Sequence, residues 1–213
     1  MNVKNSELRI RARVTLGGKI FGRQWLMGLA VSFVASALVS AASSITGGIG
    51  SIILTGPFMF GLYLTFLNAV RTKEDITFDF AFDGFKNFAQ ALLLGLMQAI
   101  FVMLWSFLFV IPGIIKSYSY SMAYYIMADH PEYDWRQCID ESKKLMKGKK
   151  WKLFCLDLSF IGWYIVGALC LGVGMLLVSP YHYMAHTEFY NELVGHKAPE
   201  EAPTTEEAPA DYI

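Results

Sequence analysis

The residues with the clearest chemical potential lie near the C-terminal end of the sequence. His182 and His186 are four positions apart, so in a helix they share one face, a spacing that can bind a metal ion. Glu188 follows two positions later, and Asp157 lies in the preceding apolar segment. Ionisable groups inside a membrane bundle are candidates for function, but two histidines and a carboxylate near a helix end more often form hydrogen bonds between helices. We therefore expect a structural network and no cofactor, with metal binding or proton handling as the alternative.

Asp157 has more than one candidate partner. It can pair with His182 or His186 in the next segment. It can also pair with Lys150 or Lys152, whose long side chains can reach along their own segment. The sequence leaves this choice open.

No motif of a known catalytic class accompanies these residues. The sequence has no GxGxxG or GxxxxGKS/T phosphate-binding loop, no HExxH zinc motif and no CxxC pair. The protein is therefore predicted not to be an enzyme. A membrane-embedded, metal-dependent enzyme that uses His182, His186 and Glu188 is the least favoured of the functions considered.

The composition is typical of a membrane protein. Of the 213 residues, 54% are hydrophobic and only 17% are charged, whereas a soluble domain has about a quarter charged residues. The apolar residues gather in long runs, which predict about six membrane-spanning helices because each span needs about 20 residues. The predicted spans are residues 25–44, 52–70, 89–111, 113–129, 153–170 and 172–193.

The central stretch, residues 104–125, is predicted to organise the others. An apolar run leads into Pro112-Gly113, which marks a bend, and a polar, tyrosine-rich run follows. This return segment is too polar to face lipid on all sides, so the other helices are expected to pack around it. Pro57 and Pro180 are expected to disturb two further spans.

The C-terminal region allows a second topology. In this alternative, one long fifth span ends near Ser179, and an interfacial helix over residues 181–193 lies outside the cell. Length favours the six-span arrangement.

The clustering of basic residues predicts the orientation of the chain. Sixteen of the 18 lysines and arginines fall within residues 1–24, 71–88 and 129–152. Cytoplasmic loops carry an excess of Lys and Arg, so these segments and, with six spans, both termini are predicted to be cytoplasmic. The rest of the chain has no basic face, which argues against nucleic-acid binding.

Two segments in the first half of the chain are predicted to be interfacial amphipathic helices. In residues 1–24, Leu8, Ala12 and Leu16 share one helical face with arginines around it. Residues 71–88 carry an aromatic stripe at helical spacing. We favour packing of this stripe against lipid over a substrate-binding aromatic box; its members are Phe78, Phe82, Phe85 and Phe88.

The clearest surface element is predicted over residues 131–152. Asp134 has the place of an N-cap, with Gln137 at the capping-box position, and Gly148 is a natural stop for the helix. Trp135 begins a mostly apolar face. The basic cluster that follows is predicted to hold the segment against anionic lipid, with recognition of a specific headgroup or protein as the alternative. It comprises Lys143, Lys144, Lys147, Lys149 and Lys150.

Several polar side chains fall inside the predicted spans. Lys116 at the bilayer centre would cost about 2.5–3.5 kcal/mol, so it is expected near a helix start, from which it can reach the interface. The other polar groups could supply contacts to a substrate. The candidates are Gln98, Lys116, Tyr118, Tyr125, Asp129 and Asp157.

The predicted organisation has three parts. Residues 1–24 form a basic interfacial segment and residues 25–194 a transmembrane helical domain. Residues 195–213 form an acidic, proline-rich tail of low complexity that is expected to be disordered.

A set of short motifs gives the chain a family resemblance. It is similar to bacterial integral membrane proteins, common in Firmicutes, that are catalogued as domain of unknown function 975. The similarity covers residues 7–193. It implies a membrane fold and topology, but no substrate, cofactor or catalytic residue. The motifs include Phe82-Asp83-Gly84-Phe85, Leu104-Trp105, Ile111-Pro112-Gly113, Ser117-Tyr118-Ser119-Tyr120, Leu145-Met146-Lys147-Gly148, Phe160-Ile161-Gly162-Trp163, Pro180-Tyr181 and Glu188-Phe189-Tyr190.

A more distant resemblance is to the membrane domain of some glycerophosphodiester phosphodiesterases. It implies a related six-helix architecture and no activity, because those enzymes carry their catalytic part in a separate domain.

These observations lead us to expect an all-α, multi-pass protein of the bacterial cytoplasmic (inner) membrane. The leading hypothesis is a non-enzymatic accessory or envelope component that binds membrane lipids or another membrane protein. The alternative is a small-molecule or ion transporter, in which helices broken at Pro57, Pro112 and Pro180 would line a midplane site. A transporter of only 213 residues would be expected to work as a homo-oligomer.

Overall fold

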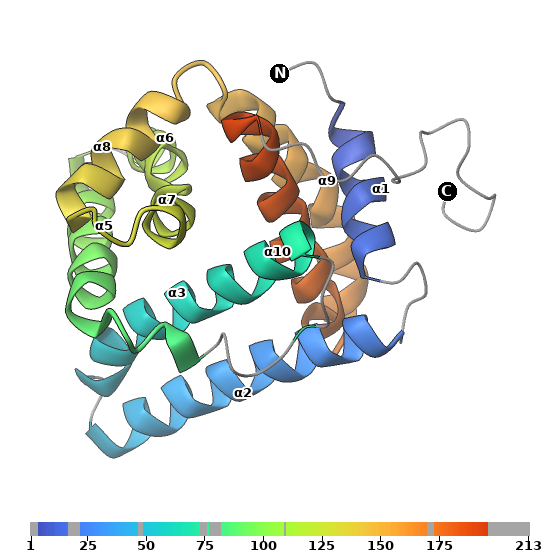
Figure 1. Cartoon of the computed structure of the whole chain (residues 1–213), viewed down its shortest axis with the longest axis horizontal. Helices are drawn as coiled ribbons and strands as arrows, with labels where there is room; N and C mark the ends of the chain where they lie inside the picture. The colour runs from blue at the N-terminus through green and yellow to red at the C-terminus, as the bar shows by residue number, and fades with distance from the viewer. Residues whose placement is uncertain are drawn as a thin grey trace. The chain divides into compact units, whose positions relative to one another are not determined.

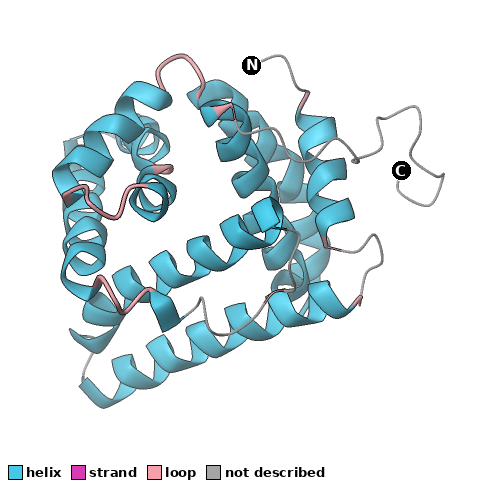
Figure 2. Ribbon diagram, in the orientation of Figure 1, coloured by secondary structure: helices cyan, strands magenta, loops and turns pink. Residues whose placement is uncertain are grey.

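The computed structural model describes residues 4–16, 22–46, 49–72, 76, 82–108, 110–169 and 173–195. Within these residues the secondary structure is helical and no strand occurs, so the predicted all-α class is confirmed (Figure 2). The helices, labelled in Figure 1, are α1 (Asn5–Thr15), α2 (Arg23–Thr46), α3 (Ile49–Thr72), α5 (Phe88–Leu108), α6 (Val110–Tyr120), α7 (Ala123–Asp129), α8 (Trp135–Leu145), α9 (Lys150–Leu169) and α10 (Val173–Val194).

Three of the described helices are long and apolar enough to cross a membrane. These candidate spans are Arg23–Ala41 in α2, Ile52–Thr72 in α3 and Phe88–Phe107 in α5. Large apolar side chains on them stay uncovered by protein: Phe33 is 52% exposed, Met103 72% and Phe107 90%. Such exposure is unfavourable in water and favourable in lipid, so these helices agree with a membrane protein.

The chain divides into two compact units. The first contains Met1–Phe33, Thr65–Thr77 and Lys152–Ile213, and the second contains Val34–Leu64 and Phe78–Trp151. Helices α2 and α3 therefore contribute residues to both units. Helices α1, α10 and α9 from Lys152 onward belong to the first unit, and α5 to α8 belong to the second.

In the first unit, the apolar face of α1 is covered by protein. Helix α1 packs against α10, and Leu8, Ala12 and Leu16 are each 0% exposed. The prediction that this face lies in the lipid interface is therefore wrong, although the residues that form the face were predicted correctly. An amphipathic pattern indicates only that an apolar surface covers one face of the helix. For α1, this surface belongs to α10.

The C-terminal helices of the first unit begin and end close to the predicted positions. Helix α9 spans Lys150–Leu169 and α10 spans Val173–Val194. Helix α10 continues through Pro180, so the alternative with a break between Ser179 and residue 181 is wrong. Residues 170–172, where the turn was predicted, lie outside the described residues.

In the second unit, α3 and α5 cross where both helices carry glycine. A Cβ atom added at Gly56 would lie 2.5 Å from the carbonyl oxygen of Ala91 and 3.0 Å from the Cα atom of Leu92. A Cβ atom added at Gly95 would lie 3.1 Å from the Cα atom of Gly56. Small residues of this kind let membrane helices approach closely, so the two glycines fix this crossing.

The prolines interrupt the helices less than the sequence indicated. Pro57 lies inside α3, and Pro180 lies inside α10, in helices that continue past them. Helix α5 ends at Leu108 and α6 begins at Val110, so the bend precedes Pro112 instead of lying at Pro112-Gly113 as predicted. Pro112 then lies in the first turn of α6, where its missing N–H is tolerated.

The predicted fourth span is two short helices. Helix α6 ends at Tyr120, α7 begins at Ala123, and a turn at Ser121 and Met122 separates them. Ser142 of α8 bridges the interruption: its hydroxyl donates to the carbonyl of Ser119 at 2.8 Å and accepts from the backbone N–H of Met122 at 3.3 Å. A distant side chain thus bonds backbone groups at the break, which the local sequence does not reveal.

Helix α8 begins as predicted. Asp134 caps it in a capping box with Gln137, whose side chain accepts from the Asp134 N–H at 2.8 Å. The helix ends at Leu145, and Gly148 in the following turn has φ +75°, a value that favours glycine.

The apolar face of α8 is covered by protein. It packs against α5, α6 and α7, and Cys138, Ile139 and Met146 are at most 2% exposed. This face is therefore part of the protein core of the second unit. The charged opposite face remains exposed.

The aromatic stripe is only partly described. Residues 73–75 and 77–81, which include Phe78, lie outside the described residues, as does the acidic tail from residue 196 onward. Phe85 packs edge-on against Phe58 of α3, with ring centroids 4.9 Å apart, whereas Phe82 is 51% exposed. Phe88 stacks on Phe85, with ring centroids 6.2 Å apart. Of the three described members of the stripe, Phe85 and Phe88 therefore contact protein, and Phe82 stays exposed.

The burial of Cys138 gives a first testable prediction. Desolvation raises the pKa of its thiol to about 11, so at pH 8 little of it is the reactive thiolate. We expect iodoacetamide to label Cys138 at least about tenfold more slowly in the folded protein than in denaturant. Mass spectrometry of the Cys138 peptide measures both rates, and equal rates would show that α8 is not docked.

Candidate functional site

Helices α9 and α10 bring three ligand-type side chains together in the first unit. Oδ1 of Asp157 lies 3.0 Å from Nε2 of His182 and 2.6 Å from Nε2 of His186. The two imidazole rings are adjacent, with centroids 4.4 Å apart, as their spacing predicted. Of the alternatives left open for Asp157, the structure shows the histidine partners.

Aromatic rings enclose part of this cluster. Phe160 and Tyr164 of α9 present T-shaped contacts to His182, with ring centroids 5.1 and 5.8 Å away. The side chains of Asp157, His182 and His186 nevertheless keep 24%, 26% and 14% exposure. The cluster is therefore walled by aromatic groups on one side and accessible on another.

Glu188 does not join the histidines, contrary to the predicted grouping. Glu188 is 2% exposed, and its carboxylate lies beside the Thr15 side chain and near Arg11. Both partners belong to α1. Positions 186 and 188 are separated by about 200° around a helix of 3.6 residues per turn, so Glu188 faces α1 while His186 faces α9.

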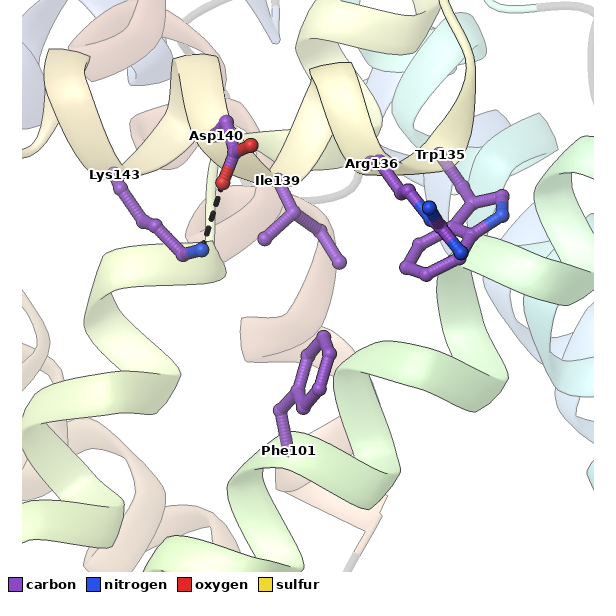
Figure 3. Close-up of a pocket in the computed structure, with 6 residues that line it drawn as sticks. All are labelled: Phe101, Trp135, Arg136, Ile139, Asp140 and Lys143. Atoms are coloured by element: carbon purple, nitrogen blue, oxygen red, sulfur yellow. Dashed lines mark hydrogen bonds and ion pairs between the residues drawn. The ribbon is translucent and has the colours of Figure 1, made fainter.

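A second candidate site lies between α5 and α8 in the second unit. It is a pocket of about 310 Å³. In Figure 3, Ile139 of α8 and Phe101 of α5 point toward one another across it, and the charged side chains come from α8. We call it the α5–α8 pocket; its lining is Phe101, Trp135, Arg136, Ile139, Asp140 and Lys143.

The charges of the α5–α8 pocket lie at its rim. Lys143 Nζ is 2.8 Å from Oδ1 of Asp140, the pair joined by the dashed line in Figure 3. The Arg136 guanidinium lies 5.0 Å from the ring centroid of Trp135. With two cations and one carboxylate, the rim has a formal excess of one positive charge above an apolar floor.

The rest of the basic cluster surrounds the end of α8 and the turn to α9. Lys144 pairs with Glu141 at 2.6 Å, and hydrogen bonding to this carboxylate raises the pKa of the lysine. Lys147 is exposed, and Lys149 and Lys150 are half-buried. The cluster is thus less strongly basic than the lysine spacing alone indicated, because α8 supplies acids to two of its members.

The polar residues predicted inside spans have protein contacts of their own. Gln98 Nε2 donates to the carbonyl of Tyr120 at 3.1 Å, at the end of α6. Lys116 lies in the middle of α6, with Nζ 4.4 Å above the ring centroid of Trp105. Tyr125 is fully buried, 4.6 Å from the ring of Tyr63.

The structure does not gather these residues into one site. Tyr118 is half-buried on α6, and Asp129 is half-buried at the end of α7. Tyr118 is separated from Tyr125 and Asp129 by the interruption between α6 and α7.

The α5–α8 pocket contains three residues that sequence reasoning missed, which are Phe101, Arg136 and Asp140. Phe101 looked like one of many apolar residues of a span, and Arg136 was not singled out beside Trp135. The available signal was the Trp135-Arg136 pair at the first turn of a capped helix, where a guanidinium can stack on an indole.

The chain matches the model of one protein family, described as Protein of unknown function (DUF975), over residues 1–116 and 107–197. No curated protein and no solved structure matches it.

Proposed function

Because the chain belongs to the DUF975 family of proteins of unknown function, we propose its function from the chemistry of its sites. We propose that it is a non-enzymatic, multi-pass protein of the bacterial cytoplasmic membrane that binds anionic phospholipid in the α5–α8 pocket. The observation that carries this proposal is a pocket with an apolar floor and a cationic rim, on a chain whose helices expose large apolar side chains.

The pocket has the two features that a phospholipid requires. Guanidinium and ammonium groups bind phosphate oxygens through charge-assisted hydrogen bonds, and Arg136 and Lys143 supply them at the rim. Phe101 and Ile139 offer apolar contact below. Leu104, one helical turn beyond Phe101 on α5, is 65% exposed, so an acyl chain can continue along this face.

The proposed topology has six spans with both termini in the cytoplasm. Helices α2, α3, α5, the α6–α7 pair, α9 and α10 are the six, and α8 lies on the cytoplasmic side. The support is the clustering of basic residues in segments that six spans place on one side, together with two separate helices at the C-terminal end. Anionic lipid headgroups on the cytoplasmic surface would then face the basic cluster.

Lipid binding is favoured over transport because the helices offer little that resembles a transport site. Helices α3 and α10 continue through Pro57 and Pro180, whereas the transporter hypothesis required breaks there. At the α6–α7 interruption, Ser142 and Gln98 already bond backbone groups. These contacts support a structural role for the break.

Neutralising the pocket rim tests the proposal. We expect the double substitution Arg136→Gln and Lys143→Gln to weaken retention of phosphatidylglycerol by about tenfold or more, because each charged hydrogen bond contributes about 1.5–3 kcal/mol. Native mass spectrometry of protein extracted from vesicles of mixed phosphatidylglycerol and phosphatidylcholine measures the retained lipid.

Lys147→Gln is the control, because it removes an exposed charge of the same segment outside the pocket. It should leave lipid retention unchanged. Equal lipid retention in the wild type and the double variant would contradict lipid binding in the pocket. In a parallel extraction from native membranes, a second protein that co-purifies with the wild type and is lost from the double variant would assign the pocket to a partner membrane protein.

A further inference from the structure

We propose that Asp157, His182 and His186 bind a divalent transition-metal ion of the Zn²⁺ class. The three side chains offer one ligand atom each, and these atoms all lie within 4.8 Å of one another. The histidine spacing alone predicts two ligands. The structure adds a third, because the Asp157 carboxylate contacts both imidazoles. This site is independent of the proposed lipid pocket, which lies in the other unit.

The separations between ligand atoms are close to those of a coordination sphere. Four ligands at about 2.0–2.2 Å from a tetrahedral ion lie about 3.4 Å from each other. Here Oδ1 of Asp157 is 3.0 Å from Nε2 of His182 and 2.6 Å from Nε2 of His186. Small outward rotations of the three side chains would open the space for an ion.

The kind of donor determines the kind of metal. Two imidazoles and one carboxylate match zinc sites with three protein ligands and one open position, and also divalent iron. Calcium and magnesium prefer all-oxygen sites, so they fit this donor set poorly. We therefore expect a transition-metal ion of borderline softness, for which Zn²⁺ and Co²⁺ are suitable probes.

The residues around the site favour a metal ion with one coordination position open to a small ligand. His182 and His186 are held on one helix, and Asp157 comes from the other, so a bound ion would join α9 to α10. Phe160 and Tyr164 shield His182 on the aromatic side. One carboxylate leaves a divalent ion with one uncompensated positive charge, so the open position would take water, hydroxide or a small anion.

Metal content tests the proposal without any assay of activity. The full chain is purified in mild detergent without a polyhistidine tag, stripped with a chelator, incubated with Zn²⁺ and desalted. Elemental mass spectrometry should find about one Zn²⁺ per chain. Co²⁺ should give the visible absorption of a four- or five-coordinate site, and Zn²⁺ should raise the unfolding temperature.

Variants locate the ion. Metal content should fall at least about tenfold in His182→Gln and His186→Gln, whose amides retain hydrogen-bonding capacity but ligate weakly. His130→Gln is the control, because His130 pairs with Glu132 on an exposed turn. Wild-type protein that holds no Zn²⁺ would overturn the proposal even if a variant failed to fold. Equal zinc content in all three variants and the wild type would also overturn it.

Discussion

Replacing Gly56 by alanine is expected to destabilise the protein by about 3 kcal/mol, the upper end of the usual cost of an inserted methyl group. The added Cβ atom would lie 2.5 Å from the carbonyl oxygen of Ala91 and 3.0 Å from the Cα atom of Leu92. Both obstacles are backbone atoms of α5, so no side chain can rotate away. Helices α3 and α5 would have to move apart.

Gly162→Ala is the control for this substitution. Gly162 also lies inside an apolar helix, α9, but a Cβ atom there would meet nothing within 4 Å. Alanine is the better helix former by about 1 kcal/mol, so this variant should be as stable as the wild type or more stable. Thermal unfolding in detergent, followed by tryptophan fluorescence, compares the two. Equal midpoints for the Gly56 and Gly162 variants would refute the close crossing of α3 and α5.

Features that depend on neighbouring residues were predictable from the sequence. The capping box of Asp134 and Gln137 formed as expected, because both partners lie within one helical turn. His182 and His186 share a face because helical periodicity requires it. The members of the buried faces of α1 and α8 were identified for the same reason.

Whether protein or lipid covers an apolar helix face could not be predicted in the same way. An apolar stripe looks identical whether lipid or protein lies against it, so the face of α1 was assigned to the membrane, whereas α10 covers it. Glu188 was grouped with the histidines by closeness in sequence, but it faces α1. Deciding such cases requires the position of a second helix, and a single sequence does not contain it.

The interruption between α6 and α7 shows the same limit and supports a strong prediction. Ser142 is fully buried and bonds both Ser119 and Met122 across the break. Ser142→Ala would remove both hydrogen bonds and leave the Met122 N–H without this acceptor. Each buried polar group that loses its partner costs about 1–3 kcal/mol, so we expect a total loss of about 2–4 kcal/mol.

Ser121→Ala provides the matched comparison, because the Ser121 hydroxyl only donates to the carbonyl of Tyr118 at 3.0 Å, within its own turn. Its loss should change the unfolding free energy by no more than about 0.5 kcal/mol. Denaturant titration in detergent measures both variants, and iodoacetamide labelling of Cys138 gives an independent reading of whether α8 has loosened. If Ser142→Ala matches Ser121→Ala in both measurements, the break between α6 and α7 does not depend on Ser142. If only the Ser142 variant unfolds earlier and exposes Cys138, then one buried hydroxyl joins the interrupted α6–α7 pair to α8.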